Sequence, residues 1–418
     1  MLITIPGGPG QRGTDLVRPG AHDPAITALF DIVSFDPRGT AGETGIDCIP
    51  EWDPFSDLDR TPDDADERRA LDARIRELAD ECRAAHGAVL PFLGTAETVL
   101  DLDGLRVALG EERVNLLGLS HGSAVALRYA SAFPDHTRAV VLDGVSDPDL
   151  PPPVRELEQI AAFERQFGEL LVECALTESC PVEGPDPGAT IDRLLDELDD
   201  APMLLGDGRE LTESDLYEAI TGTLVRGPAA QGRLLGAIAA ADGGDGSALH
   251  GLAERFRRDF EVSGLDLGTL MAITCADDGA AWARLDREEV TALTLRIAEL
   301  APRLGRWLWS PPAADDLPPV GLCAMVPEVS VSDPGPFMGT GAGPILILAA
   351  SGDPSTPASA AVLASGELAD GRLLAIRADQ HLVYPQAVAA PDTAMNRCVL
   401  EAVETHLITG APPPRGGC

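Results

Sequence analysis

A serine between two glycines is the strongest sign of chemistry in this sequence. Ser120 is the centre of the segment Gly118-Leu119-Ser120-His121-Gly122, which has the pattern G-x-S-x-G. The apolar segment 114–118 leads into it, and residues 123–132 continue as a predicted helix. A nucleophilic serine occupies such a strand-to-helix turn, because the strained turn exposes its oxygen and leaves no room for side chains at the glycines. We therefore predict that Ser120 is a nucleophile.

A serine of this kind also needs an acid and a base further along the chain, in that order. Asp353 follows the apolar segment 344–348, and His381 follows the apolar segment 372–376. Both would lie at the carboxyl ends of parallel strands, where active sites form in such sheets. We predict that His381 takes the proton of Ser120 and that Asp353 orients and stabilises the imidazole.

Other aspartate and histidine residues compete for these roles. Asp143 ends the strand that follows the nucleophile and is a rival acid, although the order of Asp before His favours Asp353. His121 directly follows the nucleophile, so its backbone N–H is the useful group. The remaining histidines have no strand before them, and we expect them at the surface: His22, His86, His136, His250 and His406.

The oxyanion of an acyl-transfer intermediate requires N–H donors. The segment Pro6-Gly7-Gly8-Pro9-Gly10 follows the first apolar segment, and its glycines allow the backbone to approach a substrate oxygen closely. We expect the N–H groups of Gly8 and His121 to form the oxyanion hole. Without Ser120 downstream, the same segment would indicate only a turn.

A parallel sheet with helices on both faces must position these residues, because apolar segments alternate with predicted helices. From about residue 151 to 336 this alternation gives way to a mostly helical pattern. We predict an α/β-hydrolase fold whose core, residues 1–150 and 337–418, is interrupted by a helical cap domain, residues 151–336. Because the chain begins inside a predicted strand, we expect N-terminal strands of this fold to be missing. The expected strands are 2–5, 31–35, 114–118, 139–142, 344–348 and 372–376, and the expected core helices are 64–85, 95–109, 123–132 and 393–406.

Composition excludes several classes of partner. The formal net charge of −37 argues against nucleic acid and anionic membranes. No apolar run is long enough to cross a bilayer, and no signal peptide is recognisable. The 8 cysteines form no C-x-x-C pair and lie apart from clustered histidines, so we expect neither a metal site nor a cofactor. Their even number suggests disulfides and an oxidising compartment, the alternative being buried free thiols.

The order of motifs carries a family resemblance. With GGPG at 7–10, DPRG at 36–39, GLSHG at 118–122, GDPSTP at 352–357 and a terminal pair of cysteines, the sequence resembles the tripeptidyl aminopeptidases of actinobacteria. These are secreted peptidases related to proline iminopeptidases, and the likeness covers nearly the whole chain. It implies the triad and oxyanion residues named above. His121 stands where that family usually has Tyr, and Pro6 where related enzymes often have His, which leaves substrate preference open.

The resemblance, together with closeness in sequence, also implies secretion and a set of disulfides. The expected pairs are Cys48–Cys82, Cys174–Cys180, Cys275–Cys323 and Cys398–Cys418.

The activity implied is release of short peptides or residues from free N-termini through an acyl-enzyme. An esterase, an amidase or a biosynthetic hydrolase acting on a small metabolite would use the same triad, and a non-catalytic binding protein could share the fold. An aminopeptidase must hold a protonated α-amine, which requires carboxylates near the nucleophile. Asp277 and Asp278, beside Cys275 in the cap, are the candidates. With 68 acidic residues in the chain, the alternative is a solvated helix face.

Overall fold

A six-stranded parallel sheet forms the centre of the molecule, in the order β2-β1-β3-β4-β7-β8. The structure is a computed structural model that describes residues 1–40, 45–46, 58–147, 149–184, 186–262, 265, 267–309, 323, 342–411 and 417–418. Each strand coincides with an expected one, and β2 is shorter than the predicted 31–35. The strands are β1 (Leu2–Ile5), β2 (Ile32–Val33), β3 (Val114–Leu119), β4 (Thr137–Asp143), β7 (Ile345–Ala350) and β8 (Gly371–Ile376).

Helices cover both faces of this sheet, because neighbouring residues of each buried strand point to opposite sides. Leu116 and Leu117 of β3, for example, belong to two different apolar cores. The core that contains Leu116 includes residues of α3 (Thr95–Ala108), α4 (His121–Ala132) and α14 (Ala358–Glu367). The core that contains Leu117 includes residues of α1 (Pro24–Thr27), α15 (Tyr384–Ala389) and α16 (Ala394–Thr409).

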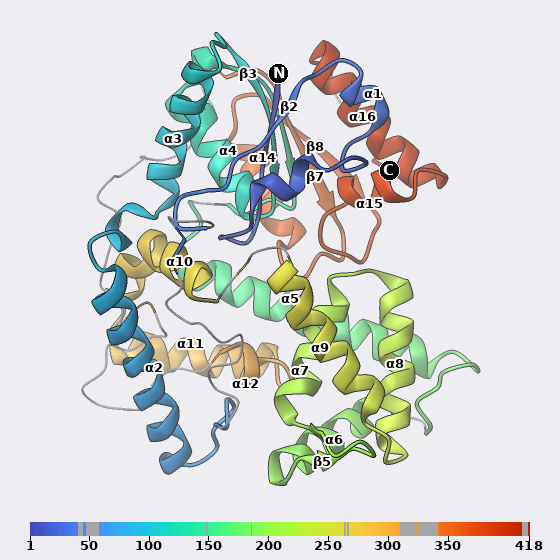
Figure 1. The fold of residues 1–418 in the computed structure, drawn as a ribbon. Helices are drawn as coiled ribbons and strands as arrows, with labels where there is room; N and C mark the ends of the chain where they lie inside the picture. The colour runs from blue at the N-terminus through green and yellow to red at the C-terminus, as the bar shows by residue number, and fades with distance from the viewer. Residues whose placement is uncertain are drawn as a thin grey trace.

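A helical insertion with an apolar core of its own separates β4 from β7. Figure 1 shows the sheet and its covering helices in the upper half of the molecule and most of the insertion below them. A short antiparallel hairpin, β5 (Met203–Leu204) with β6 (Glu210–Leu211), was not expected from the sequence. The predicted end of the cap at residue 336 lies outside the described residues. The helices are α5 (Pro152–Ala175), α6 (Pro187–Asp200), α7 (Glu213–Leu224), α8 (Pro228–Asp242), α9 (Ser247–Val262), α10 (Leu267–Trp282), α11 (Arg287–Leu300) and α12 (Gly305–Leu308).

One helix from the first part of the chain packs against the insertion. A capping box between Asp64 and Glu67 begins α2 (Ala65–His86). Its buried residues Leu71, Ile75 and Leu78 recur at helical spacing and share an apolar core with residues of α10. Figure 1 shows α2 extending along the side of the insertion. The segment 1–150 thus contributes to the packing of the insertion as well as to the sheet.

Three of the expected disulfides are present: Cys174–Cys180, Cys275–Cys323 and Cys398–Cys418. Cys82 is also disulfide-bonded, and its expected partner Cys48 lies outside the described residues. None of the helices in the described part of the chain is both long and apolar enough to span a bilayer.

The expectation that the non-catalytic histidines lie at the surface is wrong for three of the five. His22, His250 and His406 are buried, whereas the other two are half-buried. Burial lowers the pKa of His22 and of His406, which keeps both rings neutral. Each buried ring has a hydrogen-bond partner inside the protein: Leu16 O for His22 at 2.9 Å, Asp215 Oδ2 for His250 at 3.2 Å and Val140 O for His406 at 3.1 Å.

Candidate active site

The predicted nucleophile lies at a strained turn between β3 and α4. Ser120 has φ 53° and ψ −124°, a backbone conformation that residues other than glycine rarely adopt. A Cβ at Gly118 would lie 2.5 Å from the carbonyl oxygen of Gly122, and a Cβ at Gly122 would overlap the carbonyl oxygen of Ile5. Backbone packing therefore requires glycine at both ends of the motif.

The loop after β1 passes directly beside this serine. A Cβ at Gly7 would lie 2.9 Å from the Cβ of Ser120. The next residue, Gly8, has φ 103°, which only glycine adopts without strain. The loop therefore reaches the serine because its glycines have no side chains. The N–H groups of Gly8 and His121 stay our prediction for the oxyanion hole.

The predicted acid and base are hydrogen-bonded to each other. His381 Nδ1 lies 2.8 Å from Asp353 Oδ2 and 3.1 Å from Asp353 Oδ1. Asp353 is only 3% exposed and accepts further hydrogen bonds from the backbone N–H of Ser355 and from the N–H and hydroxyl of Thr356. These donors fix the carboxylate and compensate its burial.

The environment of His381 favours its protonated form. Burial alone would lower the pKa of the imidazole, but the charge and hydrogen bond of Asp353, with the charge of Asp143, outweigh it and raise the pKa. Such an arrangement stabilises the imidazolium that forms when a histidine accepts a proton from a serine hydroxyl.

Asp143, the rival acid, makes a different set of contacts. Its carboxylate accepts hydrogen bonds from the backbone N–H groups of Val383 and Tyr384, at distances of 2.7 to 3.1 Å. Burial raises the pKa of Asp143 to about 6, although these two N–H groups act in the opposite direction. Asp143 therefore anchors the chain just after His381, and the ring nitrogen of His381 bonds to Asp353 instead.

The insertion contacts both loops that carry the acid and the base. Gln159 Nε2 of α5 donates to the carbonyl oxygen of Ser355 at 2.5 Å. The backbone N–H of His381 donates to the carbonyl oxygen of Val225, just after α7, at 3.0 Å. Packing of the insertion is thus coupled to the positions of Asp353 and His381.

Asp277 of α10 is connected through Thr95 to the side chain that follows the nucleophile. It accepts hydrogen bonds from the backbone N–H of Thr95 at 2.7 Å and from the Thr95 hydroxyl at 2.5 Å. The same hydroxyl lies 3.3 Å from His121 Nε2. The Asp277 side chain is exposed, yet desolvation by the protein around it raises its pKa to about 6, against the effect of Thr95. One hydroxyl group therefore separates this carboxylate from His121.

Asp278, the second candidate for binding an amine, is engaged in an ion pair with Arg155 of α5. The next residue on α5 is Glu156, a carboxyl that the sequence analysis did not single out. Burial raises the pKa of Glu156 to about 7, partly offset by Arg155 and reinforced by Asp278. Burial, with the charges of Arg155 and of a second arginine, lowers the pKa of His121 to about 4, so its ring is neutral.

Sequence reasoning missed Thr95, Arg155 and Glu156, which lie in helices without a motif around them. Thr356 of the acid loop could have been found from the sequence. Aspartate side chains in turns commonly form hydrogen bonds with residues that follow them closely in the chain. Among the described residues, two groups of acidic side chains are spaced closely enough to share a metal ion, and neither includes a residue of this site.

Comparison with known families covers both ends of the chain. The family model described as alpha/beta hydrolase fold matches residues 1–184, and the model described as TAP-like protein matches residues 315–418. Serine protease Hip1 of Mycobacterium tuberculosis is 31% identical over 438 residues, which is 99% of this chain and 80% of that protein. Carboxylesterase B of the same species is also 31% identical, over 99% of this chain and 78% of its own. A tripeptidyl aminopeptidase of Streptomyces lividans is 37% identical over 153 residues, or 35% of this chain and 28% of that protein.

Proposed function

Because the chain belongs to the α/β-hydrolase family, with a TAP-like C-terminal region, and is a serine hydrolase, we propose that it releases short peptides or single residues from free N-termini. The fold expected from the sequence is confirmed. The support for a peptide substrate with a free amine comes from Asp277, whose carboxylate lies one hydroxyl away from His121.

In the proposed reaction, Ser120 Oγ forms a bond to the carbonyl carbon of the substrate while its proton passes to His381. Asp353 stabilises the imidazolium through the hydrogen bond at 2.8 Å. The backbone N–H groups of Gly8 and His121 stabilise the oxyanion. The C–N bond then breaks, His381 gives its proton to the leaving amine, and water hydrolyses the acyl-enzyme with His381 again as base.

The α-amine of the substrate is assigned to Asp277, with Glu156 as a second carboxylate. Thr95 holds Asp277 by two hydrogen bonds, so the carboxylate is already oriented before a substrate binds. An ammonium group bound here would lose part of its hydration and needs negative charge nearby. The charge of Asp278 is compensated by Arg155, so it contributes less than we expected from the sequence.

An esterase is the second candidate, because one relative of nearly full coverage bears the name Carboxylesterase B. An ester substrate without an amine would use the same serine, acid and base and would make no use of Asp277. A non-catalytic role has no comparable support, since the bond between His381 and Asp353 is intact.

A substrate panel distinguishes these candidates. We expect chromogenic aminoacyl, dipeptidyl and tripeptidyl amides with a free amine to be cleaved faster than their N-acetylated forms and faster than simple esters. Asp277→Asn removes the charge and keeps the shape. Since hydrogen bonds to charged groups contribute about 1.5–3 kcal/mol, KM for substrates with a free amine should rise about 10–100-fold.

Glu288→Gln is the matched control, because it removes one negative charge from an exposed position of the insertion. It should leave KM unchanged, which excludes an effect of the overall charge of −37. Equal changes in KM for free and acetylated substrates in Asp277→Asn would argue against an amine site at this residue. Faster cleavage of esters, insensitive to Asp277, would support the esterase.

We also propose that the protein acts outside the cytoplasm. Disulfides persist mainly in oxidising compartments, and three pairs of cysteines are bonded in the described structure. Peptide mapping without reduction, on protein isolated from the culture medium or cell envelope of a producing cell, tests both the location and the pairing.

A further inference from the structure

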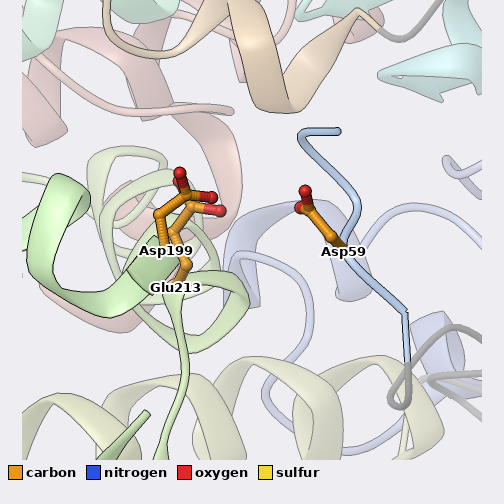
Figure 2. A group of neighbouring side chains, drawn as sticks. All are labelled: Asp59, Asp199 and Glu213. Atoms are coloured by element: carbon orange, nitrogen blue, oxygen red, sulfur yellow. The ribbon is translucent and has the colours of Figure 1, made fainter. Parts of the chain in front are cut away.

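Three carboxylates from distant parts of the chain meet far from the catalytic residues in sequence. Asp59 precedes α2, Asp199 lies near the end of α6, and Glu213 is the first residue of α7. Oxygen atoms of all three lie within 4.8 Å of one another. Figure 2 shows the carboxylates of Asp199 and Glu213 side by side, with Asp59 facing them from a separate segment.

Glu213 is the member of this group that most needs a partner. It is 8% exposed, and its Oε1 is shielded from solvent and forms no hydrogen bond in the described part of the chain. Its other oxygen accepts a hydrogen bond from Thr61, whose hydroxyl also donates to Asp59 at 3.0 Å. The hydroxyl of Tyr217 donates to the carbonyl oxygen of Arg303 at 3.2 Å, although it also lies close enough to interact with Glu213. A buried carboxylate oxygen without a donor is costly unless a cation compensates it.

Protein cations compensate this group only in part. Arg306 Nη2 lies 3.8 Å from Asp199 Oδ2, and this side chain is 41% exposed and also donates to the carbonyl oxygen of Thr61. The charge of Arg68 also acts on Asp59. Three carboxylates still outnumber these two guanidinium groups, which leaves the group with excess negative charge.

We propose that Asp59, Asp199 and Glu213 bind a Ca²⁺ ion, which links the segment before α2 to helices α6 and α7. Carboxylate and hydroxyl oxygens are hard ligands of the kind that Ca²⁺ and Mg²⁺ take. Ca²⁺ holds its ligands at about 2.3–2.6 Å, so oxygens on opposite sides of the ion stand roughly 5 Å apart, whereas Mg²⁺ requires about 4 Å. Oxygens within 4.8 Å of one another are compatible with either ion. Ca²⁺ is the better match because Mg²⁺ usually keeps several waters and binds through only one or two carboxylates, whereas three protein carboxylates meet here.

This site departs from our expectation that the protein holds no metal, which rested on the spacing of cysteine and histidine. An all-oxygen site assembled from three distant segments has no spacing pattern in the sequence. The ion would stabilise the packing of the insertion against the first part of the chain. It has no role in the proposed reaction, so the two proposals stand or fall separately.

Calorimetric titration of the chelator-treated, full-length protein with CaCl₂ tests the proposal, with MgCl₂ as the second probe. We expect binding of one Ca²⁺ per chain and a rise in Tm of a few degrees when Ca²⁺ is saturating. Glu213→Gln should weaken Ca²⁺ binding at least about tenfold, since even residues that only support metal ligands contribute about 10–100-fold. In the absence of Ca²⁺ this variant should melt at the same or a higher temperature, because repulsion is relieved.

Asp199→Asn is a second variant in case Glu213→Gln does not fold, and Asp196→Asn is the control. Asp196 is exposed on the same helix as Asp199 and outside the group, so Ca²⁺ affinity should be unchanged in its variant. The proposal is overturned by absence of a Ca²⁺-dependent change in heat or Tm. Equal losses in the site variants and in Asp196→Asn, or tighter binding of Mg²⁺ than of Ca²⁺, would overturn it as well.

Discussion

The sheet and the insertion contribute to the candidate site in different ways. The sheet provides Ser120, Asp353 and His381, each within a few residues of a strand end and each in a short motif. The insertion provides Asp277 and Glu156, the carboxylates proposed to hold the amine, which lie within helices and depend on packing for their positions. The groups proposed for bond cleavage are thus encoded locally, whereas those proposed for recognition depend on how two parts of the chain pack. Changes in the first set should reduce turnover of every substrate, and changes in the second should depend on the substrate.

The largest effect is expected at Ser120. Ser120→Ala should reduce turnover on the order of a million-fold for amides and esters alike, because removal of a triad nucleophile eliminates covalent catalysis. Loss of one hydroxyl at an accessible turn should leave Tm within about 1 °C of wild type. A fluorophosphonate probe should label wild type and the control Ser131→Ala, but not Ser120→Ala. Labelling of the Ser120 variant would place the nucleophile elsewhere.

The next largest effect distinguishes the two aspartates at neighbouring strand ends. Asp353→Asn should reduce kcat about 10⁴-fold, because the imidazole loses the carboxylate that orients and stabilises it. It should also shift the acid limb of the pH profile to lower pH. The charge of Asp353 raises the pKa of His381, so without it the lowering effect of burial remains.

Asp143→Asn serves as the comparison for that variant. Asp143 contacts backbone N–H groups after His381 rather than the ring, so the expected loss is about a hundredfold or less, the scale of a small misplacement. Activity should be lost together with Tm in this variant. If Asp143→Asn had the larger effect on kcat at unchanged Tm, the assignment of the acid would have to be reversed.

The sequence predicted the sheet well because its strands are short apolar runs, and β1, β3 and β7 are fully buried. All six strands were located, and the pairing of Asp353 with His381 could be predicted because the fold fixes the chain order of an acid and a base. The hairpin β5–β6 could not be predicted, since each strand has only two residues. Glu156 was missed because the role proposed for it depends on the packing of α5 against α10. His406 was misplaced for a similar reason, as nothing in α16 shows which of its polar residues faces β4.

A pH-dependent effect of intermediate size should separate recognition from catalysis. Enclosure raises the pKa of Asp277 to about 6 and burial raises that of Glu156 to about 7, so both carboxylates lose their charge as the pH falls through this range. A free α-amine titrates near 7.7–8.0 and stays protonated below it. The ratio of kcat/KM for a free amine to that for its acetylated form should therefore peak at about pH 7–8. Below this range the ratio should fall by up to about tenfold per pH unit, down to about pH 5.

Taking this ratio removes the titration of His381, which affects both substrates alike. In Asp277→Asn the acid limb of the ratio should become shallower, while the alkaline limb, set by the amine itself, should remain. A ratio that does not vary with pH in the wild type would mean that carboxylates do not hold the amine.

The smallest effect concerns disulfides, one near the end of the core chain and one in the insertion. Cys398–Cys418 closes a separation of 20 residues and fixes the C-terminus beside β8, where the N–H of Cys418 donates to the carbonyl oxygen of Ala375 at 3.0 Å. Cys174–Cys180 closes a separation of only 6 residues after α5. Loop-closure entropy gives about 3 kcal/mol for the longer loop and about 2 kcal/mol for the shorter one. Replacing both cysteines of each pair by alanine should therefore lower the free energy of unfolding more for the pair in the core.

Neither double variant should change kcat, because neither pair contacts the triad. Thermal unfolding and turnover measured on the same samples check this order. A drop in kcat on removing Cys174–Cys180 at unchanged Tm would mean that this end of α5 influences the site, which would break the division between local chemistry and distant packing.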